Sequence, residues 1–185
     1  MYGDTGSKLI LVCGYNGIQN QQHDVIIDSL AHIRELLIER VHLVVPLTYG
    51  ATESYINNIN MRLLKLGISY TLLTKFLSIE ELATLRKTAN IVVNIQTTDA
   101  LAISLQDHLY CGNICIIGEW LKYYIYDHNK ITYIKIAKET LTENIKYYVL
   151  NYNKESVKFK NNYHIMRNIL SWDSVIKDWI KTYGE

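Results

Sequence analysis

Residues 96–113 read QTTDALAISLQDHLYCGN and stand between two short apolar runs, NIVVNI at 90–95 and ICIIG at 114–118. Apolar positions recur at helical spacing from Leu101 to Tyr110, so this stretch predicts a helix that ends at Gly112. The two flanking runs predict buried strands. The order strand, loop, helix, strand is typical of a parallel sheet with a crossover helix.

Two carboxylates stand eight positions apart in this stretch, Asp99 in the predicted loop and Asp107 in the predicted helix. In a parallel sheet such a loop lies at the carboxyl ends of the strands, where ligands bind. The helix that follows it directs unpaired backbone N–H groups toward the same place. Amides suit phosphate and carboxylates suit hydroxyl pairs, so a nucleotide-linked ligand is expected. Both residues could equally be ordinary solvated acids of an α/β domain.

The same alternation extends along most of the chain and predicts a doubly wound, mostly parallel sheet of about six strands. The strands read as continuous apolar runs, as expected when helices cover both faces. The predicted strands are 9–13, 42–47, 68–74, 90–95, 114–118 and 131–136, and the predicted helices besides the one already described are 25–40, 53–67, 79–89, 138–152, 155–170 and 171–184.

Local signals set some of these boundaries. Asp24 is expected to cap the first helix, and Ser78 with Glu81 forms a capping-box pattern. Residues 1–8 read as a polar lead-in, and 9–185 as a single Rossmann-like domain whose C-terminal helices occupy 138–185.

Composition narrows the classes of protein. The chain has 185 residues, 49% hydrophobic and 20% charged, and a formal net charge of +1, so nothing global favours nucleic acid. Three cysteines are too few for a disulfide framework and fit a reducing compartment. A zinc site at His108, Cys111 and Cys115 lacks a fourth ligand. No apolar run has the length of a membrane span.

The pattern DALAISLQD, an acid followed by seven residues and a second acid, resembles the E-x7-E region of retaining GT-B glycosyltransferases. The resemblance implies the fold of the C-terminal, donor-binding half of such an enzyme. It also implies that Asp99, as the catalytic residue, lies near the donor sugar and positions it, and that Asp107 binds the ribose. The donor sugar and phosphate would meet backbone amides near Thr98, Ala100, Leu101, Ala102 and Ile103.

Other loops carry weaker parts of the resemblance. GYNGIQNQQH at 14–23 is similar to the glycine loop of donor domains, so Gly14, Asn16 and Gly17 are expected at the donor. In the family that loop usually carries Arg and Lys; here amide side chains and His23 stand instead. PLTYGATESYI is similar to a segment of bacterial 4-acetamido-fucose transferases and places Tyr49 and Gly50 beside the donor. Lys75, in the third loop, is expected near phosphate.

Two aromatic stretches are open to more than one interpretation. Trp120, Tyr123, Tyr124 and Tyr126 could pack the tail helices, stack on sugar or touch a membrane. The final helix, SWDSVIKDWIKTYGE, is similar to the terminal helix of many GT-B enzymes, which packs toward the partner domain.

The function implied is therefore the donor-binding half of a glycosyltransferase that uses a UDP-, GDP- or dTDP-sugar, without metal or cofactor. The acceptor would be a glycan or a lipid-linked compound, and the pathway bacterial surface polysaccharide synthesis. The partner implied is an N-terminal, acceptor-binding half on the same or a separate chain. The implied location is cytoplasmic. The basic, Tyr-rich half of the chain after residue 121 could face solvent, since its lysines form no dense cluster, or could make peripheral contact with the inner membrane face.

Two alternatives remain. One is a catalytically degenerate nucleotide-sugar-binding or regulatory module, which the missing cations in the first loop would suit. The other is a flavodoxin-like or response-regulator-like domain. That class needs a phosphate-binding loop or an acidic cluster after the first strand, and GYNGIQNQQH supplies neither.

Overall fold

The computed structural model describes residues 8–184. Residues 1–7 of the expected polar lead-in, and Glu185, lie outside the described residues. The expected doubly wound architecture is confirmed: within these residues six strands form one sheet in the order β3-β2-β1-β4-β5-β6, and the five pairs of neighbouring strands are parallel. The strands are β1 (Leu9–Cys13), β2 (Val41–Pro46), β3 (Tyr70–Leu73), β4 (Ile91–Asn94), β5 (Ile114–Gly118) and β6 (Ile134–Ile136).

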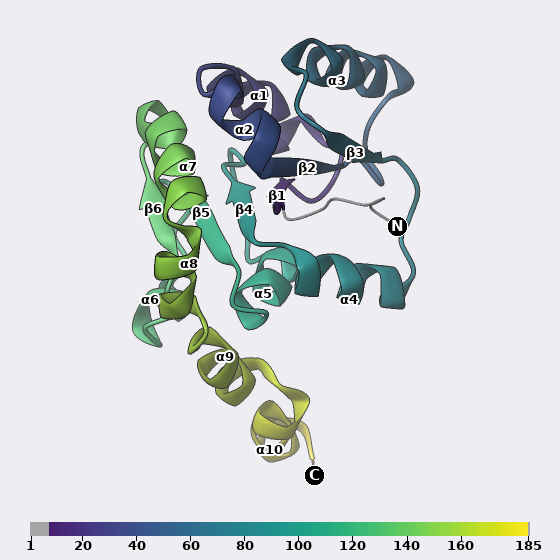
Figure 1. Ribbon diagram of the computed structural model, residues 1–185. Helices are drawn as coiled ribbons and strands as arrows, with labels where there is room; N and C mark the ends of the chain where they lie inside the picture. The colour runs from purple at the N-terminus through teal and green to yellow at the C-terminus, as the bar shows by residue number, and fades with distance from the viewer. Residues whose placement is uncertain (1–7, 185) are drawn as a thin grey trace.

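Helices cover both faces of the sheet (Figure 1). On one face lie α1 (His23–Ala31), α2 (Arg34–Arg40), α3 (Glu53–Leu66) and α7 (Leu141–Leu150). On the other lie α4 (Ile79–Thr88), α5 (Ile103–Tyr110), α6 (Tyr124–His128) and α9 (Asn162–Leu170). Successive residues of one strand serve opposite faces: Leu11 and Cys13 belong to the first core, Ile10 and Val12 to the second. The apolar runs are thus explained by burial on both sides.

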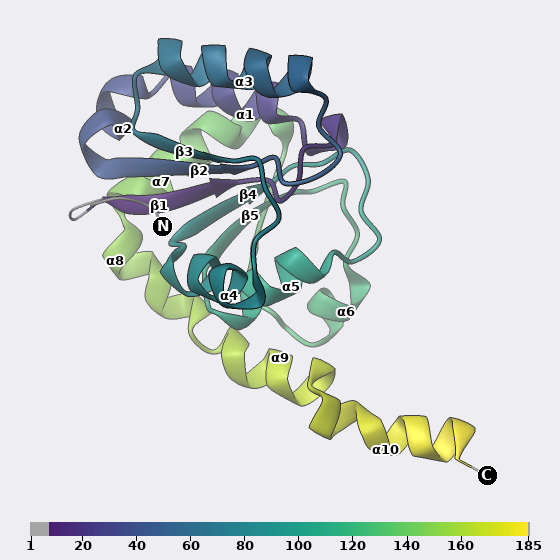
Figure 2. The same cartoon turned by 90° about the vertical axis from the view of Figure 1, so that its right-hand side faces the viewer.

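The remaining elements are short or terminal. They are η1 (Gln19–Gln21), η2 (Lys138–Thr140), α8 (Tyr152–Glu155), η3 (Ser156–Phe159) and α10 (Trp172–Tyr183). Figure 2 shows α9 and α10 leading away from the sheet at the C-terminal end. No residue of α10 is buried.

Several expected boundaries were wrong. The helix expected over 25–40 is two helices, with a break at His32 and Ile33, where Ile33 has φ −122° and ψ 22°. Arg34, which begins α2, donates from Nε to the Leu66 carbonyl at 2.7 Å and so joins α2 to the end of α3. The apolar period continues through the break, so the sequence pattern does not reveal it.

The start of α1 and the length of the last strand also differ from expectation. Asp24 is not the cap of α1; Gln22 occupies that position in a left-handed conformation, and Asp24 lies in the first turn. The sixth strand covers three of the six residues expected, Ile134–Ile136. The expected capping box is confirmed, because the Ser78 hydroxyl accepts from Glu81 N and the Glu81 carboxylate accepts from Ser78 N.

Candidate functional site

The strand order reverses between β1 and β4, because the chain runs outward through β2 and β3 and then returns to β4. In doubly wound sheets, ligands bind in the crevice that such a reversal leaves at the carboxyl ends of the strands. A hollow of about 420 Å3 lies here. Its lining comes from the loops after β1, β2 and β4 and from the start of α5: Tyr15, Tyr49, Asp99, Ala100, Leu101, Ala102, Ile103 and Ser104.

Six of those eight residues were expected from the sequence, and the structure brings them together. Tyr15 and Ser104 are additions. A larger hollow of about 530 Å3 lies at the opposite edge of the sheet, near Leu9 and Arg40. The amino ends of the strands face that edge, and none of the expected site residues lies there. We therefore take the hollow at the reversal as the candidate site.

The glycines of the first two loops hold those loops against each other. A Cβ on Gly17 would lie 2.4 Å from the Ala51 Cβ, and Gly17 N donates to the Tyr49 carbonyl at 2.8 Å. Gly50 has φ +78°, and a Cβ there would lie 2.4 Å from the Ile18 side chain. These glycines thus permit contact between protein loops.

Amide side chains of the first loop are used in the same internal way. The side-chain Oε1 of Gln96 accepts from the Gln21 side chain and from the Tyr15 hydroxyl, both at 2.9 Å. Asn20 Oδ1 accepts from the Thr98 backbone N–H at 3.2 Å. Asn16, also buried, accepts from Ile18 N at 2.8 Å. Gln21 and Asn20 thus fasten the loop after β1 to the loop after β4, an arrangement that separate sequence segments could not reveal.

Asp99 is held from two sides. Its Oδ2 accepts from the Ala102 backbone N–H at 3.2 Å and from the Tyr123 hydroxyl. Tyr123 belongs to the loop after β5 and is 3% exposed. Burial, followed by the hydrogen bond to Asp99, raises the pKa of Tyr123, so its phenol remains a donor. The Asp99 carboxylate is therefore fixed in place at the wall of the hollow.

The start of α5 opens on the hollow. The expectation that apolar helix positions begin at Leu101 was wrong: Leu101 precedes the helix and has φ +123°, a region that side chains rarely adopt. Ala102 is the N-cap and makes no side-chain capping bond. Backbone N–H groups of the first turn, at Ile103 and Ser104, therefore lie at the wall of the hollow without a side-chain cap.

Asp107 does not line this hollow. It lies on α5 about one turn beyond Ser104, 49% exposed, with its Oδ2 3.6 Å from the Arg86 Nε. Partial burial raises the pKa of Asp107, and the positive charge of Arg86 opposes that rise. Asp107 instead borders a second hollow of about 340 Å3 between α5 and α9, together with Tyr110. Its expected contact with ribose remains a prediction.

Two exposed aromatic rings stand beside the candidate site. Tyr49, after β2, and Phe76, after β3, are parallel to within 5° with centroids 5.9 Å apart. Phe76 is 77% exposed, and its neighbour Lys75 is also exposed. A third hollow, of about 410 Å3, lies on the far side of the β4 loop beside Trp120, whose indole N–H donates to the Gln96 carbonyl at 2.8 Å.

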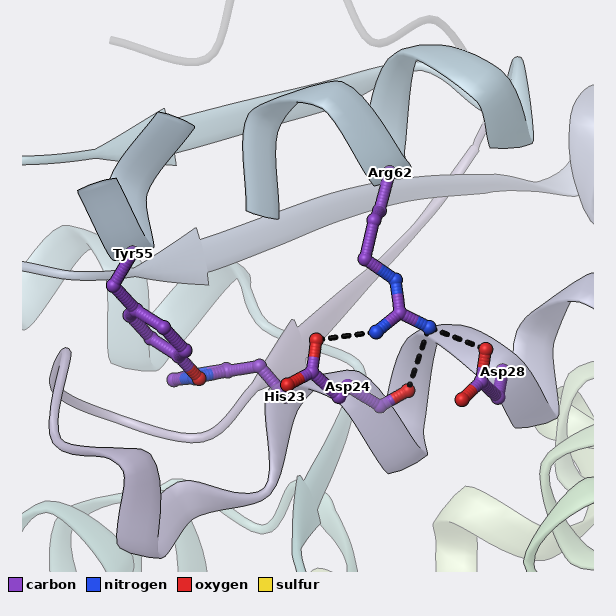
Figure 3. Close-up of polar contacts among 5 residues, drawn as sticks. All are labelled: His23, Asp24, Asp28, Tyr55 and Arg62. Carbon is purple, nitrogen blue, oxygen red and sulfur yellow. Dashed lines mark hydrogen bonds and ion pairs between the residues drawn. The ribbon is translucent and has the colours of Figure 1, made fainter. Parts of the chain in front are cut away.

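Two polar contacts join α1 to α3 (Figure 3): a buried one between His23 and Tyr55, and a more exposed one between Arg62 and the carboxylates of Asp24 and Asp28. The His23 Nδ1 lies 3.0 Å from the Tyr55 hydroxyl, and the Arg62 guanidinium donates to both Asp24 and Asp28. Burial lowers the pKa of His23 to about 4, so its ring is neutral at pH 7. This network supports the loop from below and is not part of the lining of the hollow.

Within residues 8–184, no group of three or more His, Cys, Asp or Glu side chains is arranged to hold a metal ion. His108, one of the three considered for zinc, is buried, and its Nδ1 lies 2.6 Å from the side-chain Oδ1 of Asn113. Within the same described range, no helix is long and apolar enough to cross a bilayer.

Comparison with known proteins identifies the fold. No family model and no curated protein matches the sequence. Among solved structures, WaaG, a glycosyltransferase involved in lipopolysaccharide biosynthesis, matches 99% of this chain and 49% of its own, with 17% identity and TM-score 0.75. A glycosyltransferase from Rickettsia africae matches 98% of this chain and 48% of its own (13% identity, TM-score 0.79).

Anabaena HepE, solved with UDP and glucose, matches 96% of this chain and 48% of its own, with 12% identity and TM-score 0.76. The chain thus spans about half the length of these structures. It has the Rossmann-like fold that makes up about half of a GT-B glycosyltransferase.

Proposed function

We propose that this chain is the donor-binding half of a glycosyltransferase and binds a nucleoside diphosphate sugar in the hollow between β1 and β4. One observation carries the proposal: the uncapped first turn of α5 opens on that hollow, at the point where the strand order reverses. Backbone N–H groups and the positive end of a helix favour phosphate at such a position. The UDP bound by HepE, which has the same fold, supports this ligand class.

The expected residues take specific roles in this proposal. Amides near Ile103 stabilise the charge that develops on the departing diphosphate. Asp99, held by Tyr123 and Ala102, positions the sugar at the wall of the hollow. Asp107 contacts the ribose from the next turn of α5. Tyr49 and Gly50, together with Lys75 and Thr98, border the nucleotide, and no step requires a metal ion.

The acceptor side lies on another half, which we propose to be an N-terminal domain of the same or a separate chain. Closure of two halves positions the acceptor and excludes water. The chain alone therefore binds donor and transfers nothing. The exposed, aromatic face of α10 is available for contact with that half: Trp172 is 63% exposed and Tyr183 73%.

The finer assignment follows from the resemblance of DALAISLQD to the E-x7-E region. It gives a retaining transferase with similarity to the 4-acetamido-fucose transferases, acting in bacterial surface polysaccharide synthesis. In this assignment the protein works in the cytoplasm, at the inner face of the membrane.

A thermal-shift series tests the donor site. The chain is melted alone and with UDP, GDP, dTDP and their sugar conjugates at millimolar concentration. Because a ligand that binds only the folded state must raise the Tm, we expect one nucleotide series to raise it. A Tm that no nucleotide moves contradicts the proposal for this chain.

A second candidate is a nucleotide-sugar-binding module without catalysis. One observation favours it: the residues that line the hollow include no Lys or Arg, and the amides of the first loop bind other loops instead. Turnover assays with the N-terminal half restored separate the two. Donor affinity without turnover would favour the module.

A further inference from the structure

The candidate site poses a problem of charge. A nucleoside diphosphate brings at least two negative charges into a hollow whose lining contains the carboxylate of Asp99 and neither Lys nor Arg. Hydrogen bonds to Tyr123 and Ala102 stabilise that carboxylate but leave its charge in place. Hydrogen bonds from a cationic donor to phosphate are stronger than those from neutral donors, so a positive charge near the amides would strengthen diphosphate binding.

A buried cation lies directly behind the wall of the hollow. Arg86, on the last turn of α4, is 6% exposed. One terminal nitrogen of its guanidinium donates to the Ser104 hydroxyl oxygen at 2.9 Å, and its Nε lies 3.6 Å from the Asp107 carboxylate. Ser104 is in the first turn of α5 and lines the hollow.

The direction of that hydrogen bond matters. Because guanidinium can only donate, the Ser104 oxygen accepts from Arg86, and the hydroxyl proton remains to be donated elsewhere. A donor whose own oxygen is bonded to a cation is polarised and becomes a better donor. Ser104 can thus offer an O–H beside the N–H groups of the same turn.

We propose that Arg86 and Ser104 together recognise the diphosphate: Ser104 donates to a phosphate oxygen, and Arg86 supplies the positive charge from behind it. This inference rests on the proposed function. In the family that this chain resembles, Arg and Lys of the first loop usually supply the positive charge. In this chain a single cation on α4 would supply it instead. Asp107, whose carboxylate lies 3.6 Å from the Arg86 Nε, offsets part of that positive charge.

Neighbouring groups respond to the same charge. Burial is the main reason that the pKa of His108 falls to about 3, and the positive charge of Arg86 lowers it further. Arg86 also opposes the rise in the Asp107 pKa. A buried charge is screened by salt less than a surface charge, so its effect on a bound phosphate persists at physiological ionic strength.

The competing interpretation is structural: Arg86 merely joins α4 to α5. Both interpretations predict that removing Arg86 lowers the Tm, so stability does not separate them. Affinity for the diphosphate relative to the nucleoside does separate them, since the nucleoside lacks the group that Ser104 and Arg86 would bind.

The test measures Kd by calorimetry for the nucleoside diphosphate that raises the Tm, and by NMR titration for its nucleoside. Ser104→Ala, Arg86→Lys and Arg86→Gln are compared with the wild-type chain. The controls are Ser29→Ala, a half-buried helical serine on α1, and Arg62→Gln, a cation that joins α1 to α3. We expect Ser104→Ala and Arg86→Gln to weaken diphosphate binding about tenfold or more and nucleoside binding less than about twofold.

Arg86→Lys, which keeps the charge and loses the fork, should fall between the wild type and Arg86→Gln. If Arg86→Gln does not fold, Ser104→Ala decides the question, because it removes one oxygen from a half-buried side chain. If the wild-type chain binds the diphosphate and Ser104→Ala has the same ratio of diphosphate to nucleoside affinity as the wild type, this inference is overturned and the proposed function is not. A wild-type chain that binds no nucleoside diphosphate would overturn the proposed function as well.

Discussion

The Tyr123 hydroxyl donates to the Asp99 Oδ2, and the Ala102 backbone N–H donates to the same oxygen at 3.2 Å. Tyr123 follows β5 and Asp99 follows β4, so the bond joins two neighbouring strand-end loops. It fixes the carboxylate that we propose to lie near the donor sugar.

Tyr123→Phe tests that contact. Removing the hydroxyl takes one donor from a charged acceptor, which typically costs about 1–3 kcal/mol of unfolding free energy. We expect urea titrations to show that loss of stability. We also expect the substitution to reduce affinity for the nucleotide sugar more than affinity for the nucleotide. Tyr133→Phe is a suitable control, because its hydroxyl also donates to a carboxylate, Asp127, on the surface. Equal effects of both changes on sugar binding would contradict the role of Asp99.

Stability should fall in mild acid because of two buried histidines. Unfolded histidine has a pKa near 6.5, whereas burial lowers the folded pKa of His23 to about 4 and that of His108 to about 3. At a pH between the folded and the unfolded pKa of each histidine, the unfolded chain binds more protons than the folded chain. The free energy of unfolding therefore decreases as the pH falls below about 6.5. The His23 contribution is of order 3 kcal/mol by pH 4.

Urea titrations at several pH values between 7.5 and 4 measure this loss. The variant His23→Gln keeps an amide that can bond to Tyr55, and it should flatten the dependence. His32→Gln, on an exposed histidine of the same region, should leave the dependence unchanged. A wild-type stability that is constant across this range would refute the prediction.

Asp107→Ala should weaken donor binding without unfolding the domain. The side chain is 49% exposed, so its removal costs little stability, whereas a ribose contact would be lost. Calorimetry with the nucleoside is the informative measurement, because removing Asp107 also frees more of the Arg86 charge for a diphosphate. Nucleoside affinity equal to that of the wild type would remove the ribose role.

Phe76→Ala should weaken nucleoside binding and leave the Tm unchanged. Phe76 is 77% exposed and its ring is parallel to that of Tyr49, which lines the hollow. An exposed flat ring in this position can stack on a planar base. An aromatic pair contributes about 0.5–1.5 kcal/mol beyond area burial, so we expect a loss of a few-fold in affinity. Tyr124→Ala, an equally exposed ring on α6, is the matched control. Equal losses in both variants would exclude a base-stacking role.

A chain that ends at Ser171 should melt within ~2 °C of the full chain, because α10 buries no residue. Its rings contact one another instead: Trp179 lies 6.2 Å from Trp172 and 5.1 Å from Tyr183 between centroids. Donor affinity should also be unchanged, and association with the proposed N-terminal half should be lost. A Tm lower by more than ~5 °C would mean that α10 stabilises this domain directly.

Local patterns were enough to predict the sheet and several of its boundaries. Strands buried on both faces must be continuously apolar, and Ser78 and Glu81 lie close enough in sequence to cap α4 by themselves. The position of Asp99 at a strand-end loop was predictable for the same reason. These features depend on residues a few positions apart.

The break between α1 and α2 was not predictable, because Arg34 finds its partner, the Leu66 carbonyl, 32 residues away. The use of the first-loop amides was not predictable either. The sequence left them available for phosphate, whereas Gln21 binds Gln96, 75 residues away.

The sequence alone therefore determined the alternation of strands and helices and the position of the acid pair, since periodicity and capping are local. The tertiary structure decided which side chains face the hollow and which hold its loops together. Arg86 is the clearest case: nothing in IEELATLRKTA marks it, and only the packing of α4 on α5 places its charge behind Ser104. Contacts between distant segments depend on how the helices pack on the sheet, and that packing leaves no local pattern.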